Sequence, residues 1–210
     1  MKRILALSLL LAVTLTSIFS CGETEEFDDH ANWKKRNSEF LDSIAMRCDL
    51  NSQAYTSVDD IPEGQMFKLL SYKLAPGQPH GNSAYVYCNI LKKGNDTISP
   101  KYTDSIRVNY RVRLMPTHNY PEGQVVDQSF KTANLDPSVN IPSSFAVSGL
   151  IDGVATALMY MHCGDYWRLY IPQELGYGTT EKTSIPGYSA LIFEINLTEI
   201  ARTGQELSPR

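Results

Sequence analysis

The stretch LIDGVATALMYMHCG, Leu150 to Gly164, decides the fold, because it carries a helical pattern in a region where the other patterns are those of strands. Five of its residues recur at helical spacing: Ile151, Val154, Ala155, Leu158 and His162. Gly164 is a natural C-terminal stop for such a helix. One amphipathic helix laid across a twisted antiparallel sheet is the simplest arrangement of these elements. The sequence therefore predicts an α+β domain with a pocket between the helix and the sheet.

Alternating segments on either side of this helix predict the strands of the sheet. Residues 105–115, SIRVNYRVRLM, alternate most regularly, so one face of this strand is predicted to be core and the other to face water. The core side has Ile106, Val108, Tyr110, Val112 and Leu114, and the water side has Arg107, Asn109, Arg111 and Arg113. Other strand-like runs occupy residues 66–75, 83–94, 167–171 and 189–200. In the last run Phe193, Ile195 and Leu197 alternate with Glu194, Asn196 and Thr198.

Two turn-rich segments separate these strands. Residues 116–142 are interrupted only by the strand-like QVVDQSF at residues 124–130. In RLYIPQELGYGTT, residues 168–180, Pro172 has no N–H to continue a strand, and Gly176 and Gly178 allow a tight turn around Tyr177. Tyr177 is then either a packing residue of a surface turn or a side chain turned toward the expected pocket.

The N-terminal 20 residues have the pattern of a signal peptide. Lys2 and Arg3 precede an apolar run that is too short for a comfortable membrane span, and the run ends at IFSC, which resembles a bacterial lipobox. We interpret Cys21 as a lipidated N-terminus, the alternative being an ordinary signal peptide that is cleaved nearby. The predicted organisation is a lipoprotein signal peptide at 1–20, an acidic tether and amphipathic helix at 21–65, the main domain at 66–201 and a tail at 202–210.

Residues from about 25 to 48 predict the amphipathic helix. Its apolar residues recur at near-helical spacing and form one face: Trp33, Phe40, Leu41, Ile44 and Cys48. That face needs a partner, which is either the main domain or, in a homodimer, a second copy of the chain. The protein is predicted to lie at the cell envelope, lipid-anchored and either periplasmic or surface-exposed.

Charge and composition exclude several classes of function. The chain carries 19 basic and 23 acidic residues, and without residues 1–20 the basic count falls to 17, because Lys2 and Arg3 are lost. No basic run interrupts this acidity, so no nucleic-acid partner is expected. The histidines are scattered and no CxxC or HExxH motif occurs, so no metal site and no cofactor are expected. Of Cys48, Cys88 and Cys163, one pair could oxidise and at least one thiol stays free.

Six segments between about residues 84 and 200 together resemble the FKBP-type peptidyl-prolyl cis-trans isomerases, here in a bacterial lipoprotein form. In chain order they are YCNILKKGND, DSIRVNYRVRL, GQVVDQSF, FAVSGLIDGVATALMYMHCGD, YIPQELGYG and IPGYSALIFEINLTEI. The resemblance implies a curved antiparallel sheet wrapped around one short helix. It also implies an apolar, aromatic pocket for a prolyl ring, with proline-containing polypeptide segments as the substrates.

The resemblance assigns roles to ten residues. The catalytic positions are Tyr110 and Phe193 on the aromatic wall, Asp127 beside the bound carbonyl, Ile151 with its backbone N–H on that carbonyl, and Tyr177 with its hydroxyl in the pocket. The substrate-binding positions are Val126, Phe145, Leu150, Val154 and Ile185. Val126 stands where the family usually has an aromatic residue, and Val154 where it often has the tryptophan of the pocket floor. Both departures reduce the apolar surface that a proline could bury.

Three functions follow from this reading. The first is isomerisation of X–Pro bonds in exported proteins, which would assist their folding. The second is an FKBP-like module that binds proline-containing or unfolded segments with weak or no turnover, which the two valines favour. The third is a structural envelope lipoprotein that assembles through its N-terminal helix.

Overall fold

The computed structural model describes residues 28–50, 55–136 and 138–209. The predicted signal peptide, Cys21 and most of the acidic tether lie outside these residues. The described part contains two helices, α2 (Trp33–Leu50) and α3 (Asp152–Leu158). The strands are β1 (Met66–Leu70), β2 (Tyr85–Lys92), β3 (Ser105–Leu114), β4 (Val125–Gln128), β5 (Ser143–Ala146), β6 (Tyr166–Ile171) and β7 (Leu191–Ala201).

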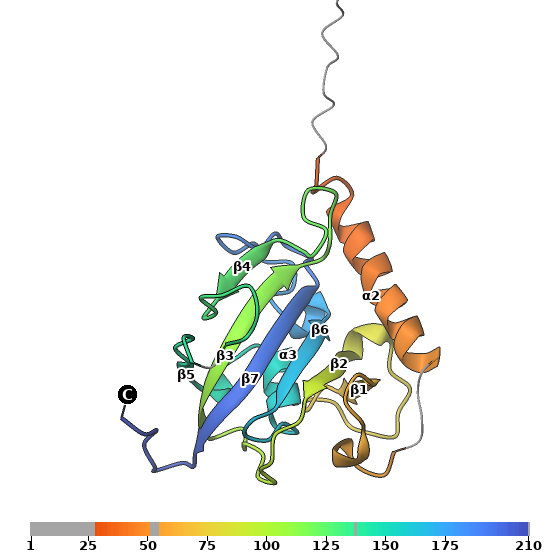
Figure 1. The fold of residues 1–210 in the computed structure, drawn as a ribbon. Coiled ribbons are helices and arrows are strands. Elements are labelled where there is room, and N and C mark those ends of the chain that lie inside the picture. The colour runs from red at the N-terminus through yellow and green to blue at the C-terminus, as the bar shows by residue number, and fades with distance from the viewer. Residues whose placement is uncertain (1–27, 51–54, 137, 210) are drawn as a thin grey trace, which may run out of the picture.

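These strands form one antiparallel sheet in the order β1-β2-β6-β7-β3-β4, and β5 pairs with the other end of β3. The two longest strands, β3 and β7, lie side by side through the middle of the sheet (Figure 1). The sheet is strongly curved, and α3 lies within its concave face. This is the predicted α+β architecture of one short helix wrapped by an antiparallel sheet.

The core lies between α3 and the concave face. Alternation on β6, which lies over the predicted run at residues 167–171, places Trp167, Leu169 and Ile171 there, all almost completely buried. Gly153 allows α3 to lie directly on β6, because a Cβ at this position would come within 2.4 Å of the Ile171 side chain. The helix is shorter than its sequence pattern. It ends at Leu158, and His162 and Gly164 belong to the turn that follows.

The predicted N-terminal helix is α2, which covers the other face of the sheet near β1 and β2 (Figure 1). It begins later than the predicted start near residue 25, because residues 29–32 form a turn, and it ends at Leu50. Leu41, Ile44 and Cys48 are buried in a cluster with Tyr87 of β2, whereas the neighbouring Val86 and Cys88 face the main core. The indole N–H of Trp33 donates to Ser189 Oγ at 2.9 Å. The chain's own domain is therefore the partner of this apolar face within the described residues.

The prediction that the second face of β3 is wet is wrong at two of its four residues. Asn109 and Arg111 are almost fully buried, as are Glu194 and Asn196 on β7. The reason is the chain after β4, which folds over this face and places the ring of Phe130 4.6 Å from the Arg111 guanidinium. A regular alternation of polar and apolar residues cannot distinguish a solvated face from one that a distant loop covers.

Two further differences concern short elements. The run at residues 66–75 is a strand only as far as Leu70, because the chain turns at Ser71 and the Leu74 N–H donates back to the Ser71 carbonyl. Strand β5 was not predicted as a strand. It has only four residues and is held by its pairing with Ile106 and its neighbours on β3, which sequence periodicity does not reveal.

Candidate functional site

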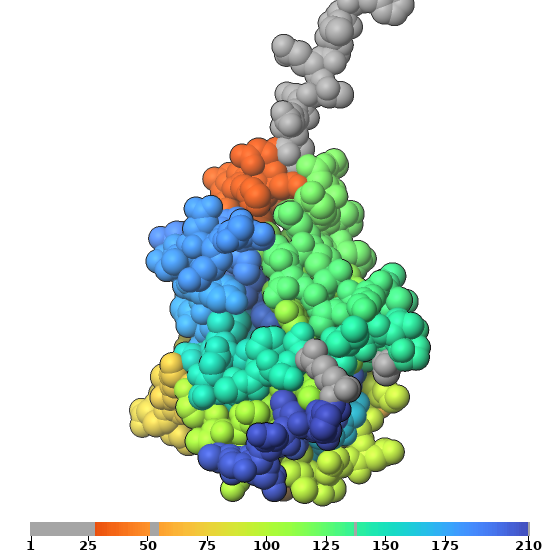
Figure 2. Space-filling view, turned by 90° about the vertical axis from the view of Figure 1, so that its left-hand side faces the viewer, coloured from red at the N-terminus to blue at the C-terminus, as the bar shows by residue number. Residues whose placement is uncertain are grey.

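A cavity of about 300 Å³ opens between α3 and the concave face of the sheet. Figure 2 shows the hollow between the lobe formed by the β6–β7 connection and the segments around β4 and β5. Most of its wall is apolar, and the side chains come from β3, β4, β5, β7, α3 and the connecting loops. The lining residues are Val108, Tyr110, Val112, Asp127, Phe145, Gly149, Leu150, Ile151, Val154, Tyr177, Ile185, Phe193 and Ile195.

The structure brings nine of the ten predicted site residues to this cavity. The exception is Val126, which is half-buried, packs against the core and does not line the cavity. Four lining residues were not predicted as site residues: Val108, Val112, Gly149 and Ile195. Three of these lie two positions from Tyr110 or Phe193, on the same face of the same strand. The period of two that predicted the core side of each strand was therefore a signal that could have found them.

Tyr110 and Asp127 form a polar pair on one wall of the cavity. The hydroxyl of Tyr110 on β3 donates to Asp127 Oδ2 on β4 at 3.0 Å. The Tyr110 ring lies edge-on to Phe145, with 5.7 Å between the ring centroids. Burial, followed by the hydrogen bond to Asp127, raises the pKa of Tyr110 to about 12, so the phenol is neutral at physiological pH.

Ile151 contributes a backbone donor to the lining of the cavity. It is the residue before α3, with an extended backbone (φ −60°, ψ 149°), and its carbonyl accepts the Ala155 N–H at 3.0 Å. Within the described residues no acceptor is recorded for its own N–H. A donor without a partner beside an apolar cavity is suited to a ligand carbonyl.

Tyr177 reaches the cavity from the opposite rim. Gly178 has φ +64°, a conformation that favours glycine, and its N–H donates to the Gln173 carbonyl at 2.8 Å. Tyr177 is 37% exposed and lines the cavity. Burial, and then the negative charge of Asp127, raises the pKa of Tyr177. The Lys182 ammonium lies 5.8 Å from the centre of the ring.

The part of the cavity wall that comes from α3 and β7 is apolar. Val154 on α3 is buried and lies with Ile195 and Phe193 of β7 among the lining residues. Val154 is a small aliphatic residue at the position where the resemblance implies the tryptophan of the pocket floor. The site is thus an apolar cup with few polar groups in its lining.

The family model for FKBP-type peptidyl-prolyl cis-trans isomerases matches residues 96–198, the segment that supplies every residue lining the cavity. Residues 96–198 belong to the FKBP family. The elements α2, β1 and β2 precede this FKBP segment in the chain. The FKBP-type 22 kDa isomerase of Escherichia coli is 38% identical over 112 residues, which are 53% of this chain and 48% of that protein. The isomerase Mip of Coxiella burnetii is 32% identical over 105 residues, 50% of this chain and 40% of that protein.

The chain therefore spans about half or less of the length of these curated relatives. Among solved structures, FkpA from Escherichia coli is similar over 95% of this chain and 70% of that chain, with a TM-score of 0.50 and 18% sequence identity. At this identity the structural likeness shows the FKBP fold alone.

Proposed function

We propose that the FKBP domain catalyses the cis–trans isomerisation of X–Pro peptide bonds. The observation that carries this proposal is the apolar cavity with an unpaired donor in its lining, the Ile151 N–H, and the Tyr177 phenol at its rim, within the described residues. The two similar proteins described above are both named as peptidyl-prolyl cis-trans isomerases, which supports the same activity.

The chemistry requires no nucleophile. Rotation about an X–Pro bond meets a barrier of about 18–20 kcal/mol, because amide resonance is lost in the twisted state. No bond is made or broken, so a catalyst has only to bind the twisted amide better than either planar isomer. The twisted amide has less charge separation than the planar one, and a dry apolar cup therefore favours it.

Each polar group of the site has a role in this scheme. The prolyl ring would enter the cup between Tyr110, Phe193 and Val154. The carbonyl before the proline would accept hydrogen bonds from the Ile151 N–H and the Tyr177 hydroxyl, two donors fixed by the backbone around them. Asp127 already accepts the Tyr110 hydroxyl at 3.0 Å, so its role is to orient that phenol and not to act as a base.

The alternative is a binding module that holds proline-containing segments without efficient turnover. The observation that favours it is that Val154 lines the cavity, because valine offers less apolar surface to a proline than the tryptophan that the resemblance implies. Burial is worth about 25 cal/mol per Å², so a missing aromatic floor would cost about 1–3 kcal/mol of binding.

An isomerase assay on a series of X–Pro peptides separates the two functions. We expect the wild-type chain to accelerate isomerisation, and the Tyr110→Phe and Ile185→Ala variants to be slower. Tyr120→Phe is the matched control, since Tyr120 is an exposed tyrosine outside the cavity. Saturable binding of the same peptides with no acceleration by the wild-type chain would favour the binding module and contradict the isomerase proposal.

We further propose that the clients are exported proteins that fold at the cell envelope, where Cys21 would anchor the chain to lipid. The support is the N-terminal pattern of Lys2, Arg3, the apolar run and IFSC. None of the helices in the described residues is long and apolar enough to cross a membrane. We expect Cys21→Ser to release an unlipidated chain from the membrane fraction. The anchor would be contradicted if the wild-type N-terminus carried no lipid and if the wild type and Cys21→Ser were found in the same fractions.

A further inference from the structure

The cavity pair of Tyr110 and Asp127 has a counterpart on the outer face of the same two strands. Successive residues of a strand point to opposite faces, so Arg111 and Gln128, each one position further along, lie behind that pair. Arg111 and Gln128 are register partners in the β3–β4 ladder, and Arg111 Nε donates to Gln128 Oε1 at 2.8 Å. Each strand thus contributes one residue to the cavity pair and one to the pair behind it.

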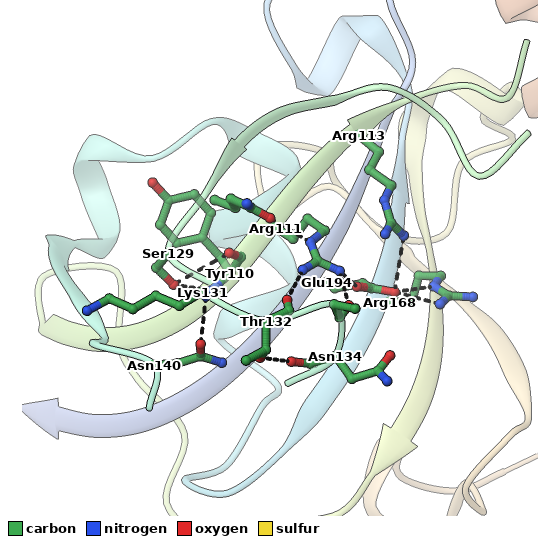
Figure 3. A network of polar contacts seen from close by, with 12 residues as sticks. Tyr110, Arg111, Arg113, Ser129, Lys131, Thr132, Asn134, Asn140, Arg168 and Glu194 are labelled. Atoms are coloured by element: carbon green, nitrogen blue, oxygen red, sulfur yellow. Dashed lines mark hydrogen bonds and ion pairs between the residues drawn. The ribbon is translucent and has the colours of Figure 1, made fainter. Parts of the chain in front are cut away.

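Arg111 also binds the chain that follows β4. Its Nη1 donates to the Ala133 carbonyl and its Nη2 to the Thr132 carbonyl, both at 2.6 Å. The side chain is only 5% exposed, and the ring of Phe130 packs over its guanidinium. In Figure 3 dashed lines join Arg111 to this loop across the outer face of the sheet. One guanidinium therefore fastens both β4 and the loop after it to β3.

Glu194 of β7 supports Arg111 from the other side. It is the register partner of Arg111 and also of Arg168 on β6, so the three side chains form a row across the sheet. Arg168 donates to Glu194 Oε1 from Nη2 at 2.6 Å and from Nε at 3.2 Å, and Arg111 Nη1 lies 3.9 Å from Glu194 Oε2 (Figure 3). This buried carboxylate compensates the buried charge of Arg111 and limits its orientation.

Strand β4 has few other attachments. It has four residues, pairs with β3 alone at the edge of the sheet, and its ladder is interrupted by a register shift between Val112 and Arg113. Only Val126 of its residues is partly buried. Just beyond it, Ser129 exchanges hydrogen bonds with Tyr110: the Tyr110 N–H donates to Ser129 Oγ at 2.8 Å and the Ser129 N–H to the Tyr110 carbonyl at 2.9 Å. Besides these bonds, β4 and the loop after it are held by the contacts that Arg111 makes with Gln128, Thr132 and Ala133 on the outer face.

We infer that Arg111 is a positioning residue, which holds Asp127 and Ser129 against Tyr110 from behind the sheet. The inference rests on the proposed function in so far as this pair serves a proline ligand. Arg111 does not touch the cavity, and its effect passes through β4.

The first test is amide hydrogen exchange in Arg111→Met, with Arg168→Met as the matched control. Arg168 shares Glu194 with Arg111 but, among the residues that the structure describes, makes no hydrogen bond or ion pair with β4 or the loop after it. In Arg111→Met we expect the Ser129 amide to exchange at least about tenfold faster than in the wild type, while the amides of β6 and β7 exchange at the wild-type rate. In Arg168→Met we expect the Ser129 amide to exchange at the wild-type rate. Equal protection of Ser129 in all three proteins would overturn the inference.

The second test is a double-mutant cycle with Tyr110→Phe, measured as kcat/KM on an X–Pro peptide. If Arg111 acts through the Tyr110–Asp127 pair, Arg111→Met should lower kcat/KM about three- to tenfold in the wild-type background and less than about twofold in Tyr110→Phe. If Arg111 only stabilised the fold, Arg111→Met would lower kcat/KM by the same factor in both backgrounds. That result would overturn the inference.

If Arg111→Met does not fold, Gln128→Ala takes its place, because it removes the Nε contact of Arg111 and leaves the buried charge paired. Gln128→Ala should raise the exchange rate of the Ser129 amide by about two- to fivefold. An unchanged exchange rate would contradict the inference. Absence of turnover in the wild-type chain would instead contradict the proposed function. The exchange result would still decide whether Arg111 positions β4.

Discussion

The hydroxyl of Tyr110 donates to the carboxylate of Asp127 at 3.0 Å, across two strands and 17 positions of the chain. The carboxylate therefore has a fixed donor at one oxygen, and the phenol is oriented within an otherwise apolar wall. Such a pair shapes and polarises the cavity but moves no proton at neutral pH. This is the behaviour that a catalyst of bond rotation requires, since it needs fixed dipoles and no acid or base.

The raised pKa of Tyr110 predicts a loss of stability in alkali. Burial first, and then the bond to Asp127, raises this pKa to about 12, against about 10 in an unfolded chain. The folded state therefore holds the proton more tightly. The contribution of this raised pKa to the free energy of unfolding is fully present below about pH 10 and is lost as the pH rises toward 12. In urea unfolding between pH 8 and 11.5, Tyr110→Phe should lose stability less steeply than the wild type. If stability fell with pH at the same slope in Tyr110→Phe and the wild type, the raised pKa of Tyr110 would be contradicted. Tyr120→Phe, which replaces an exposed tyrosine, is the control and should have the wild-type slope.

Tyr177→Phe tests whether the phenol at the rim binds the substrate. The change keeps the ring and removes one hydroxyl, and a neutral hydrogen bond is worth about 0.5–1.5 kcal/mol. We expect kcat/KM to fall about two- to tenfold with little change in melting temperature, and to fall much further in Tyr177→Ala. Tyr160→Phe is the control, since Tyr160 is similarly exposed but lies outside the cavity. Full activity with a clear loss of stability would make Tyr177 a packing residue only.

Val154→Trp tests the floor of the cavity. Val154 is buried on α3 and lines the cavity, so an indole at this position should offer more apolar surface to a prolyl ring and tighten peptide binding. Overpacking of the core could lower stability by about 1–3 kcal/mol, so thermal unfolding must be measured with affinity. A folded variant that binds proline peptides no better than the wild type would show that the floor does not limit binding.

Asp104 predicts a loss of stability in acid at the opposite end of β3. Its carboxylate is buried, accepts the Lys101 N–H at 2.7 Å and binds the Arg202 guanidinium. Burial alone would raise the pKa of Asp104, but these hydrogen bonds and the charge of Arg202 together lower it. The stability that this lowered pKa contributes is present when the pH is above the pKa of an unfolded aspartate, about 3.9. It is lost as the pH falls through the pKa of Asp104 in the folded chain.

Asp104→Asn should therefore destabilise the chain by about 1–3 kcal/mol at pH 7, measured by denaturant unfolding. The difference from the wild type should shrink below pH 4, because the wild-type carboxyl is then protonated as well. Asp96→Asn, a change at an exposed carboxylate, is the control. A difference that stays constant from pH 7 to pH 3 would contradict the lowered pKa.

Much of the site could be predicted from the sequence because each of its strands has a period of two. Knowing that Tyr110 and Phe193 face the core was enough to place Val108, Val112 and Ile195 beside them, although these three were not named as site residues. Val126 shows the limit of this reasoning. It precedes Asp127, and β4 turns its side chain toward the core and away from the cavity. The β3–β4 ladder has a register shift between Val112 and Arg113, and sequence alternation does not reveal such an irregularity.

The sequence by itself determined the elements that local patterns control: the helix after Ile151, the alternation of β3, β6 and β7, and the turn around Tyr177. These depend on periodicity and on the backbone freedom of a few residues, which any segment carries with it. Tertiary structure alone decided that the second face of β3 is buried and that Arg111 holds β4 from behind. The burial of Arg111 follows from the pairing of distant strands and from a loop that folds over them, and no local pattern encodes which face such a loop will cover.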